Sequence, residues 1–136
     1  MTALADTGFV VALENTRDRY HVSCLNILRR EREIYLPQSI LNEACYLLTK
    51  IGGNWAAAQF LQHIPTSKFI LISLSQHDLD RTAELLIKYA DTRVDFADAT
   101  VVAVAERLNI TRILTLDRRD FDIIRPAHTD HFELLP

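Results

Sequence analysis

The sequence has few of the residues that define specialised chain classes. Its 136 residues include only two cysteines, three glycines and four prolines. Two cysteines set among apolar neighbours do not make a disulfide scaffold, so we expect a reducing, cytoplasmic location. Apolar runs such as residues 9–13 are far shorter than the roughly 20 residues that cross a membrane. Asp6 interrupts the start too early for a signal peptide, so we expect no membrane association.

The sequence also lacks an excess of basic charge and several catalytic motifs. A net charge of −3 and a pI of about 5.9 count against a nonspecific DNA-binding protein. The chain has no glycine-rich phosphate loop, no Gly-x-Ser-x-Gly turn and no Cys-x-x-Cys pair. These absences exclude kinase, dinucleotide-binding and serine-hydrolase interpretations.

Short apolar segments alternate with longer segments of helical periodicity, and 49% of the residues are hydrophobic. We predict strands at 2–6, 33–37, 69–73 and 112–116, with a fifth candidate at 132–135. Helices are predicted from residue 9, over 18–33, over 39–51 up to a Gly-Gly stop, and over 55–63, 75–90 and 96–108. The pattern predicts one α/β domain over residues 1–136, with a mostly parallel central sheet of four to five strands and helices on both faces.

Acidic residues stand where such a sheet binds its ligands, beyond the carboxyl ends of the strands. Asp6 ends the first predicted strand and Asp117 the fourth, so both should lie at the same edge. Asp98 lies in the first turn of the helix over 96–108, and Glu43 about one turn into the helix over 39–51. Taken singly, the aspartates could also be helix caps, first-turn acids or turn residues.

Two of these acids are expected to be partly buried. Glu43 has Ile40 and Leu47 at helical spacing, and Asp98 has Val101. A half-buried carboxylate is costly unless it is paired or bound to a cation. Four acids without histidine or cysteine favour Mg²⁺ or Mn²⁺ over Zn²⁺. If the fold brings them together, either a cation neutralises them or their pKa values rise.

Four segments in this order resemble the PIN-domain nucleases, and within them the VapC-like toxins of bacterial toxin–antitoxin pairs. The segments are Leu4-Ala5-Asp6-Thr7-Gly8-Phe9, Ser39-Ile40-Leu41-Asn42-Glu43, Asp95-Phe96-Ala97-Asp98-Ala99-Thr100 and Ile113-Leu114-Thr115-Leu116-Asp117-Arg118-Arg119-Asp120-Phe121. The resemblance covers the whole chain. It implies a single PIN-like domain with metal-dependent ribonuclease activity, an antitoxin partner whose tail enters the acidic groove, and a homodimer.

The resemblance also implies roles for individual residues. Asp6, Asp98 and Asp117 would hold Mg²⁺ or Mn²⁺, and Glu43 would orient a water or help to hold a second ion. Four further residues are assigned auxiliary positions: Thr7, Asp95, Thr115 and Asp120. Attack by an activated water would leave a 3′-hydroxyl and a 5′-phosphate, whether one ion or two operate.

The RNA must be held by basic residues, because the acids repel phosphate. The candidates are Arg17, Arg19, Lys50, Arg118 and Arg119. Arg118 and Arg119 are the strongest candidates because they directly follow a proposed ligand. The alternative for all five is a solvated surface charge. An aromatic content of 8% indicates no base-stacking platform.

Two other function classes compete with the nuclease hypothesis: phosphoryl transfer through an aspartate, as in phosphatases and receiver domains, and a non-catalytic binding module. Haloacid-dehalogenase-like phosphatases need a second aspartate two residues after the first, where this chain has Gly8. Receiver domains need an acidic pair near the first strand and a lysine late in the chain, but the last lysine is Lys88. A non-catalytic PIN-fold module that binds RNA or protein stays open, because a fold alone does not require catalysis.

Overall fold

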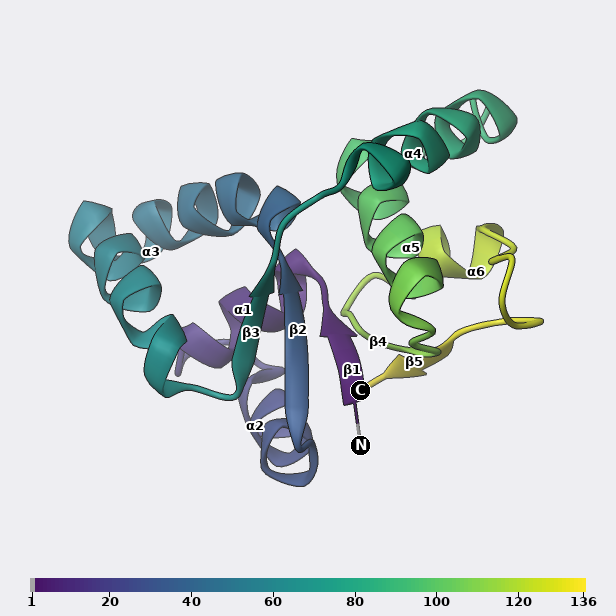
Figure 1. The fold of residues 1–136 in the computed structure, drawn as a ribbon. Coiled ribbons are helices and arrows are strands. Elements are labelled where there is room, and N and C mark those ends of the chain that lie inside the picture. The colour runs from purple at the N-terminus through teal and green to yellow at the C-terminus, as the bar shows by residue number, and fades with distance from the viewer. Residues whose placement is uncertain (1) are drawn as a thin grey trace.

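Five parallel strands form one central sheet, in the order β3-β2-β1-β4-β5, in the computed structural model, which describes residues 2–136 (Figure 1). The strands are β1 (Thr2–Ala5), β2 (Glu33–Pro37), β3 (Phe69–Ile72), β4 (Arg112–Leu114) and β5 (Glu133–Leu135). The helices are α1 (Thr7–Glu14), α2 (His21–Arg30), α3 (Leu41–His63), α4 (Gln76–Lys88), α5 (Phe96–Leu108) and α6 (Arg118–Ile123), with short 3₁₀ turns at Gln38–Ile40 and Ile64–Thr66. The predicted α/β class and parallel sheet are confirmed.

The first strand lies at the centre of the sheet, although its sequence has little intrinsic strand preference. Leu4 is paired with Tyr35 of β2 on one side and with Ile113 of β4 on the other. The side chains of Leu4, Ile34 and Ile113 are fully buried. Pairing on both edges and burial on both faces therefore override the weak propensity of the alanines, as is typical of parallel sheets.

The strand order reverses at β1, which makes its carboxyl end the switch point of the sheet. The chain leaves β1 for β2 and β3 on one side, and returns to β4 and β5 on the other. The connections that follow β1 and β4 therefore diverge from neighbouring strand ends. In open α/β sheets this is the position where a ligand crevice forms.

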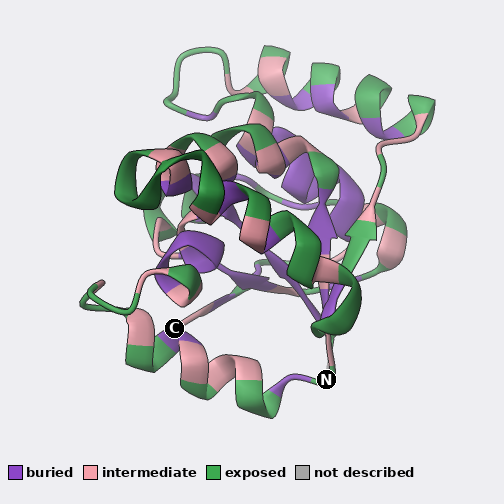
Figure 2. Cartoon of the chain, turned by 90° about the vertical axis from the view of Figure 1, so that its left-hand side faces the viewer, coloured by how far each residue is buried: buried purple, intermediate pink, exposed green. Residues whose placement is uncertain are grey.

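The helices form two groups, to the left and the right of the strands in Figure 1. Helix α1 contacts α2 and α3, whereas α4 packs along α5. In α5, every residue from Asp98 to Ala105 is buried, because its alanines and valines are small enough for the helix to sit deep in the domain. Figure 2 shows a buried centre of strands and helix surfaces, surrounded by exposed outer helix surfaces, while the edge strand β3 is largely exposed.

Helix α3 keeps the interruption that the sequence predicts. Its segments before and after the Gly-Gly pair are helical, but Gly52 and Gly53 have non-helical backbone angles. Gly53 has φ of +73°, a left-handed conformation that glycine adopts without a Cβ clash. The two predicted helices are thus confirmed as two segments joined by a kink.

Three features differ from the prediction: the end of one strand, the presence of a short helix and the length of another helix. Strand β4 ends at Leu114, before the predicted end at residue 116, and Asp117 therefore stands at the start of α6. Helix α6 was not predicted, because six residues are too few to show a helical period. Helix α2 covers His21–Arg30 only, since Glu31 already has an extended backbone and leads into β2.

Within residues 2–136, none of the helices combines the length and the apolar character that a bilayer span requires.

Candidate active site

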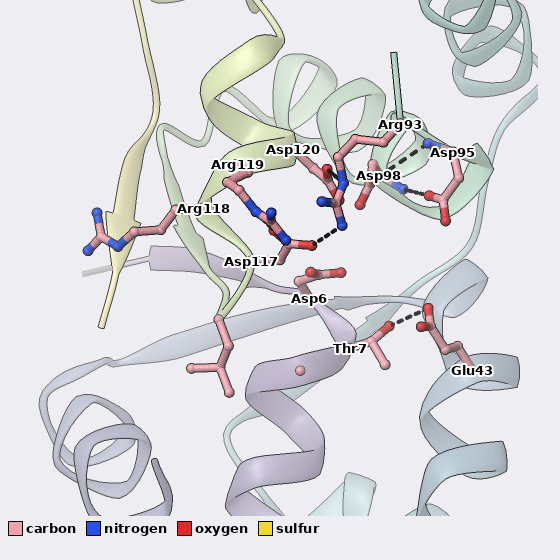
Figure 3. Close-up of a pocket in the computed structure, with 12 residues that line it drawn as sticks. Asp6, Thr7, Glu43, Arg93, Asp95, Asp98, Asp117, Arg118, Arg119 and Asp120 are labelled. Atoms are coloured by element: carbon pink, nitrogen blue, oxygen red, sulfur yellow. Dashed lines mark hydrogen bonds and ion pairs between the residues drawn. The ribbon is translucent and has the colours of Figure 1, made fainter. Parts of the chain in front are cut away.

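An acidic pocket of about 830 Å³ opens at the carboxyl edge of β1 and β4 (Figure 3). Its lining residues come from α1, α3, the α4–α5 loop, α5 and the segment that includes α6. They are Asp6, Thr7, Gly8, Glu43, Arg93, Asp95, Asp98, Leu116, Asp117, Arg118, Arg119 and Asp120. The structure therefore brings all four of the principal predicted acids to one pocket, together with Asp95 and Asp120.

Asp6 points into the pocket from the junction of β1 and α1. It occupies the N-cap position of α1, but its side chain makes no capping hydrogen bond. Instead, Thr115 Oγ1 donates to Asp6 Oδ2 over 3.1 Å. The helix-cap alternative is thus wrong for Asp6. Thr115 itself is buried beneath the pocket and positions an acid rather than lining the cavity.

Asp95 and Asp98 form a reciprocal capping box at the start of α5. The Asp98 amide donates to Asp95 Oδ1 over 2.9 Å, and the Asp95 amide donates to Asp98 Oδ2 over 3.3 Å. The capping alternative is therefore confirmed for this pair. Asp98 is also buried and lines the pocket, so the cap fixes the carboxylate at the floor of the site.

Glu43 lies on the opposite wall, in the first turn of α3. Its side chain is exposed, so the predicted half-buried position is wrong. The reason is that the turn carrying Glu43 projects into the open pocket, while Ile40 and Ala44 face the core. Thr7 Oγ1 donates to Glu43 Oε2 over 3.4 Å, which links the α1 and α3 walls.

Asp117 and Asp120 lie at the start of α6, and both form ion pairs with Arg93. Arg93 Nε lies 2.7 Å from Asp120 Oδ1, and Arg93 Nη2 lies 3.5 Å from Asp117 Oδ2. Asp117 occupies the N-cap position of α6 without a capping hydrogen bond, and its amide donates to Thr115 Oγ1 over 3.0 Å. Asp120 is buried and thus belongs to the site more fully than its sequence position indicated.

Arg93 was missed by the sequence analysis. It precedes Asp95 by two residues, in the loop before α5, and no motif marks it. One sequence signal was available. A basic residue beside the N-terminus of a helix is disfavoured by the helix dipole, so a nearby acid is needed to hold it there.

The arginines that were predicted to bind RNA have different environments. Arg118 turns towards the last strand, where its Nη2 donates to the backbone oxygens of Leu134 and Pro136 over 3.0 and 2.7 Å (Figure 3). Arg119 stays 75% exposed, with its Nε 4.0 Å from Asp117 Oδ1. The other predicted residues, Arg17, Arg19 and Lys50, are outside the pocket lining.

The carboxylates at the pocket floor hold protons more tightly than free aspartates. Burial raises the pKa of Asp6 to about 6, and the charges of Glu43 and Asp95 add to the rise. Burial also raises the pKa of Asp98 to about 8, with further contributions from Asp95 and Asp120. The sequence predicts that clustered acids have raised pKa values unless a cation neutralises them, and Asp6 and Asp98 have such raised pKa values.

The donor set suits a hard divalent cation. Six carboxylates and the Thr7 hydroxyl line the pocket, and no histidine or cysteine does. Oxygen donors of this kind favour Mg²⁺ or Mn²⁺. As the side chains lie, no three Asp, Glu, His or Cys residues in the 2–136 region are grouped so that they could hold an ion. The chemistry of the residues fits a metal, and binding one requires side-chain rearrangement.

Comparison with known proteins defines the class of this fold and site. The family described as PIN domain matches residues 3–125. The chain therefore belongs to the PIN-domain family, as its motifs indicated.

Within that family, the chain is similar to VapC proteins. It is 31% identical over 134 residues to Ribonuclease VapC26 of Mycobacterium tuberculosis (strain ATCC 25618 / H37Rv), covering 98% of this chain and 99% of that protein. The crystal structure of M. tuberculosis VapC20, described as a Sarcin-Ricin loop cleaving toxin, has a TM-score of 0.79 at 20% identity, covering 87% of this chain and 92% of VapC20. VapBC2 of Rickettsia felis, bound to a promoter DNA fragment, has a TM-score of 0.71 at 17% identity. The match covers 98% of this chain and 97% of the Rickettsia felis chain.

Proposed function

We propose that this chain is a divalent-metal-dependent endoribonuclease that hydrolyses RNA phosphodiester bonds in the acidic pocket. The observation that carries the proposal is the convergence of Asp6, Asp98 and Asp117, from distant segments, on one pocket at the switch point of the sheet. The similarity to Ribonuclease VapC26 over nearly the full length supports the same activity.

In this proposal, Asp6, Asp98 and Asp117 hold Mg²⁺ or Mn²⁺, and Glu43 faces them from the other wall of the pocket. The ion, when bound, supplies an activated water and polarises the phosphoryl group. Thr115 orients Asp6 through its hydroxyl, and the Asp95 cap orients Asp98. Asp120 is an auxiliary acid beside Asp117. Arg119 is exposed at the pocket and is our candidate for holding a substrate phosphate.

The partners follow from the relatives. The solved structures similar to this chain include a toxin–antitoxin complex from Klebsiella pneumoniae, with a TM-score of 0.67 at 21% identity. We propose that this chain is likewise the toxin of a cytoplasmic pair, with an antitoxin that covers the pocket. We also propose a homodimer, for which the exposed apolar side chains of Val22, Tyr46 and Ile51 offer contact area.

The test is cleavage of RNA by the purified chain, with and without Mg²⁺ or Mn²⁺, followed by mapping of the cut ends. We expect 3′-hydroxyl and 5′-phosphate ends, loss of cleavage in excess EDTA, and a loss of at least about 100-fold for Asp98→Asn. Asn can still accept the Asp95 amide, so this variant keeps the cap of α5. Asp122→Asn, an exposed change on α6 outside the pocket lining, is the matched control.

Two results would contradict the proposal. Full cleavage in EDTA would exclude metal dependence, and cyclic-phosphate ends would exclude water as the nucleophile. RNA binding without any cleavage would instead favour the non-catalytic binding module.

A further inference from the structure

Arg93 is a basic residue that reaches into the acidic pocket. It extends from the loop before α5 towards the first turn of α6, and Figure 3 shows its guanidinium among the carboxylates. Its Nε lies 2.7 Å from Asp120 Oδ1, and its Nη2 lies 3.5 Å from Asp117 Oδ2. Half of the side chain stays exposed, at 49%, so the guanidinium can leave towards solvent without unfolding the loop.

The backbone position of Arg93 is unfavourable for a positive charge. The residue stands two positions before Asp95, the N-cap of α5, where the helix dipole presents its positive end. The acids across the pocket therefore provide the attraction that holds the guanidinium in place. The Arg93 Nε atom lies 2.7 Å from the buried carboxylate of Asp120. It thus acts as the internal counter-ion for one half of the acidic site.

The other half of the site has a different charge balance. Among residues 2–136, none of the ion pairs involves Asp6, Glu43, Asp95 or Asp98. The negative charge of the pocket is therefore neutralised unevenly, with Arg93 on the α6 side. A dication held by Asp6, Asp98 and Asp117 would lie close to the Arg93 guanidinium, because both cations are drawn to Asp117, and the two positive charges would repel each other.

We propose that Arg93 is the resident counter-cation of the pocket and that it exchanges with the divalent ion. With Arg93 in place, Asp117 and Asp120 are held towards the loop before α5. In this arrangement of residues 2–136, no three acids lie close enough together to hold a metal ion. When the ion binds, Asp117 joins Asp6 and Asp98, and the guanidinium moves out to the pocket mouth. This inference rests on the proposed function, in which Asp117 is a ligand.

The first test measures Mn²⁺ binding to the full chain by calorimetry, without RNA. Arg93→Gln removes the competing cation, so we expect it to bind Mn²⁺ about three- to tenfold more tightly than the wild type. Arg93→Lys keeps a cation, and its affinity should stay within about twofold of the wild type. An unchanged or weakened affinity in Arg93→Gln would overturn the exchange.

Two controls separate local exchange from a general change of charge. Arg30→Gln removes the same charge from the exposed last turn of α2, outside the pocket lining, and should leave Mn²⁺ affinity unchanged. Arg119→Gln removes a charge that also lies near Asp117, at 4.0 Å, without an ion pair to Asp120. If Arg119→Gln tightened Mn²⁺ binding as much as Arg93→Gln does, mere proximity of charge would explain the gain and the exchange would be wrong.

The second test needs no substitution. The NMR signal of the Arg93 Nε–H group reports its ion pair with Asp120, and we expect this signal to shift in step with Mg²⁺ binding. A signal that stays fixed while Mg²⁺ binds would overturn the exchange but leave the proposed function intact. If the wild type bound neither Mg²⁺ nor Mn²⁺, the metal-dependent function itself would fail, and the exchange with it.

Discussion

The hydroxyl of Thr115 joins the two strand ends that carry the site: it donates to Asp6 Oδ2 over 3.1 Å and accepts from the Asp117 amide over 3.0 Å. Residues 109 positions apart in the chain are thereby fixed relative to each other. The hydrogen bond also lowers the pKa of Asp6, against the larger upward effect of burial. A single buried side chain thus positions the central acid and partly offsets the rise in its pKa.

Thr115→Val should move the pH dependence of the enzyme upward. Loss of the donor leaves the Asp6 carboxylate less stabilised, so its pKa rises further and the active ionised form appears at higher pH. We expect a loss of activity of about three- to tenfold near pH 6 and a smaller loss near pH 8. Rate profiles against pH measure the shift. Thr115→Ser keeps the hydroxyl and should restore the wild-type profile, and a valine variant with an unshifted profile would contradict this role.

The metal-free protein should lose stability as pH rises. Folding raises the pKa of Asp6 from 3.8 to about 6 and that of Asp98 from 3.8 to about 8. The folded state therefore binds more protons than the unfolded state above pH 3.8, and its advantage declines as pH rises through those folded values. We expect the free energy of unfolding in EDTA to fall by roughly 1–3 kcal/mol between pH 5 and pH 8.

Urea denaturation at the two pH values measures this loss. Asp98→Asn should flatten the dependence, because the neutral amide does not titrate. Asp78 and Glu106 have lowered pKa values, so the stability they add is lost only in more acidic solutions and does not affect this window. Stability that increased from pH 5 to pH 8 in EDTA would show that the acids are not destabilised by their proximity.

Asp95 should act on catalysis through the position of Asp98. Asp95→Ala removes the acceptor for the Asp98 amide, with an expected loss of about 1 kcal/mol of stability and a reduced kcat. Asp95→Asn retains an acceptor and should keep most of the stability. Unfolding curves and steady-state rates of the two variants separate the cap from the charge: activity lost equally in both would point to a need for the Asp95 charge itself.

Arg118 and Arg119 should give opposite phenotypes despite being neighbours. Arg118→Gln breaks the hydrogen bonds to the Leu134 and Pro136 oxygens, so we expect a loss of about 1–3 kcal/mol of stability and little change in RNA affinity. Arg119→Gln should leave stability within about 0.5 kcal/mol and weaken RNA binding, with a shallower dependence on salt.

Thermal denaturation and filter binding at several salt concentrations check both variants. RNA binding that weakened in Arg118→Gln without a loss of stability would support the assignment of Arg118 to RNA and contradict its structural role.

The fold was predictable because its signals are local and repeated. Apolar strand segments such as β2, in which Ile34 and Leu36 are buried, and the Ala/Val pattern of α5 indicate the strand and helix types, and alternation of the two implies a parallel sheet. The carboxyl-edge rule then placed Asp6 and Asp117 together without knowledge of side-chain contacts. The acids of the pocket were accordingly the part of the site that sequence could predict.

What sequence could not predict depends on contacts between distant segments. The exposure of Glu43 follows from the open pocket in front of α3, which no helical pattern encodes. Arg93 meets Asp117 and Asp120 only through the packing of the α5 and α6 starts, and a six-residue helix leaves no period to find. Arg118 turned away because the last strand supplies acceptors that lie 16 and 18 residues further along.

The central position of β1 has a consequence for how the protein is made. Its partner β4 begins at Arg112, so a nascent chain that has left the ribosome only as far as α5 has neither Thr115 nor Asp117 beside Asp6. Truncated or half-synthesised copies therefore lack the assembled pocket, and under the proposed function such a chain becomes able to cleave RNA only once translation is nearly finished.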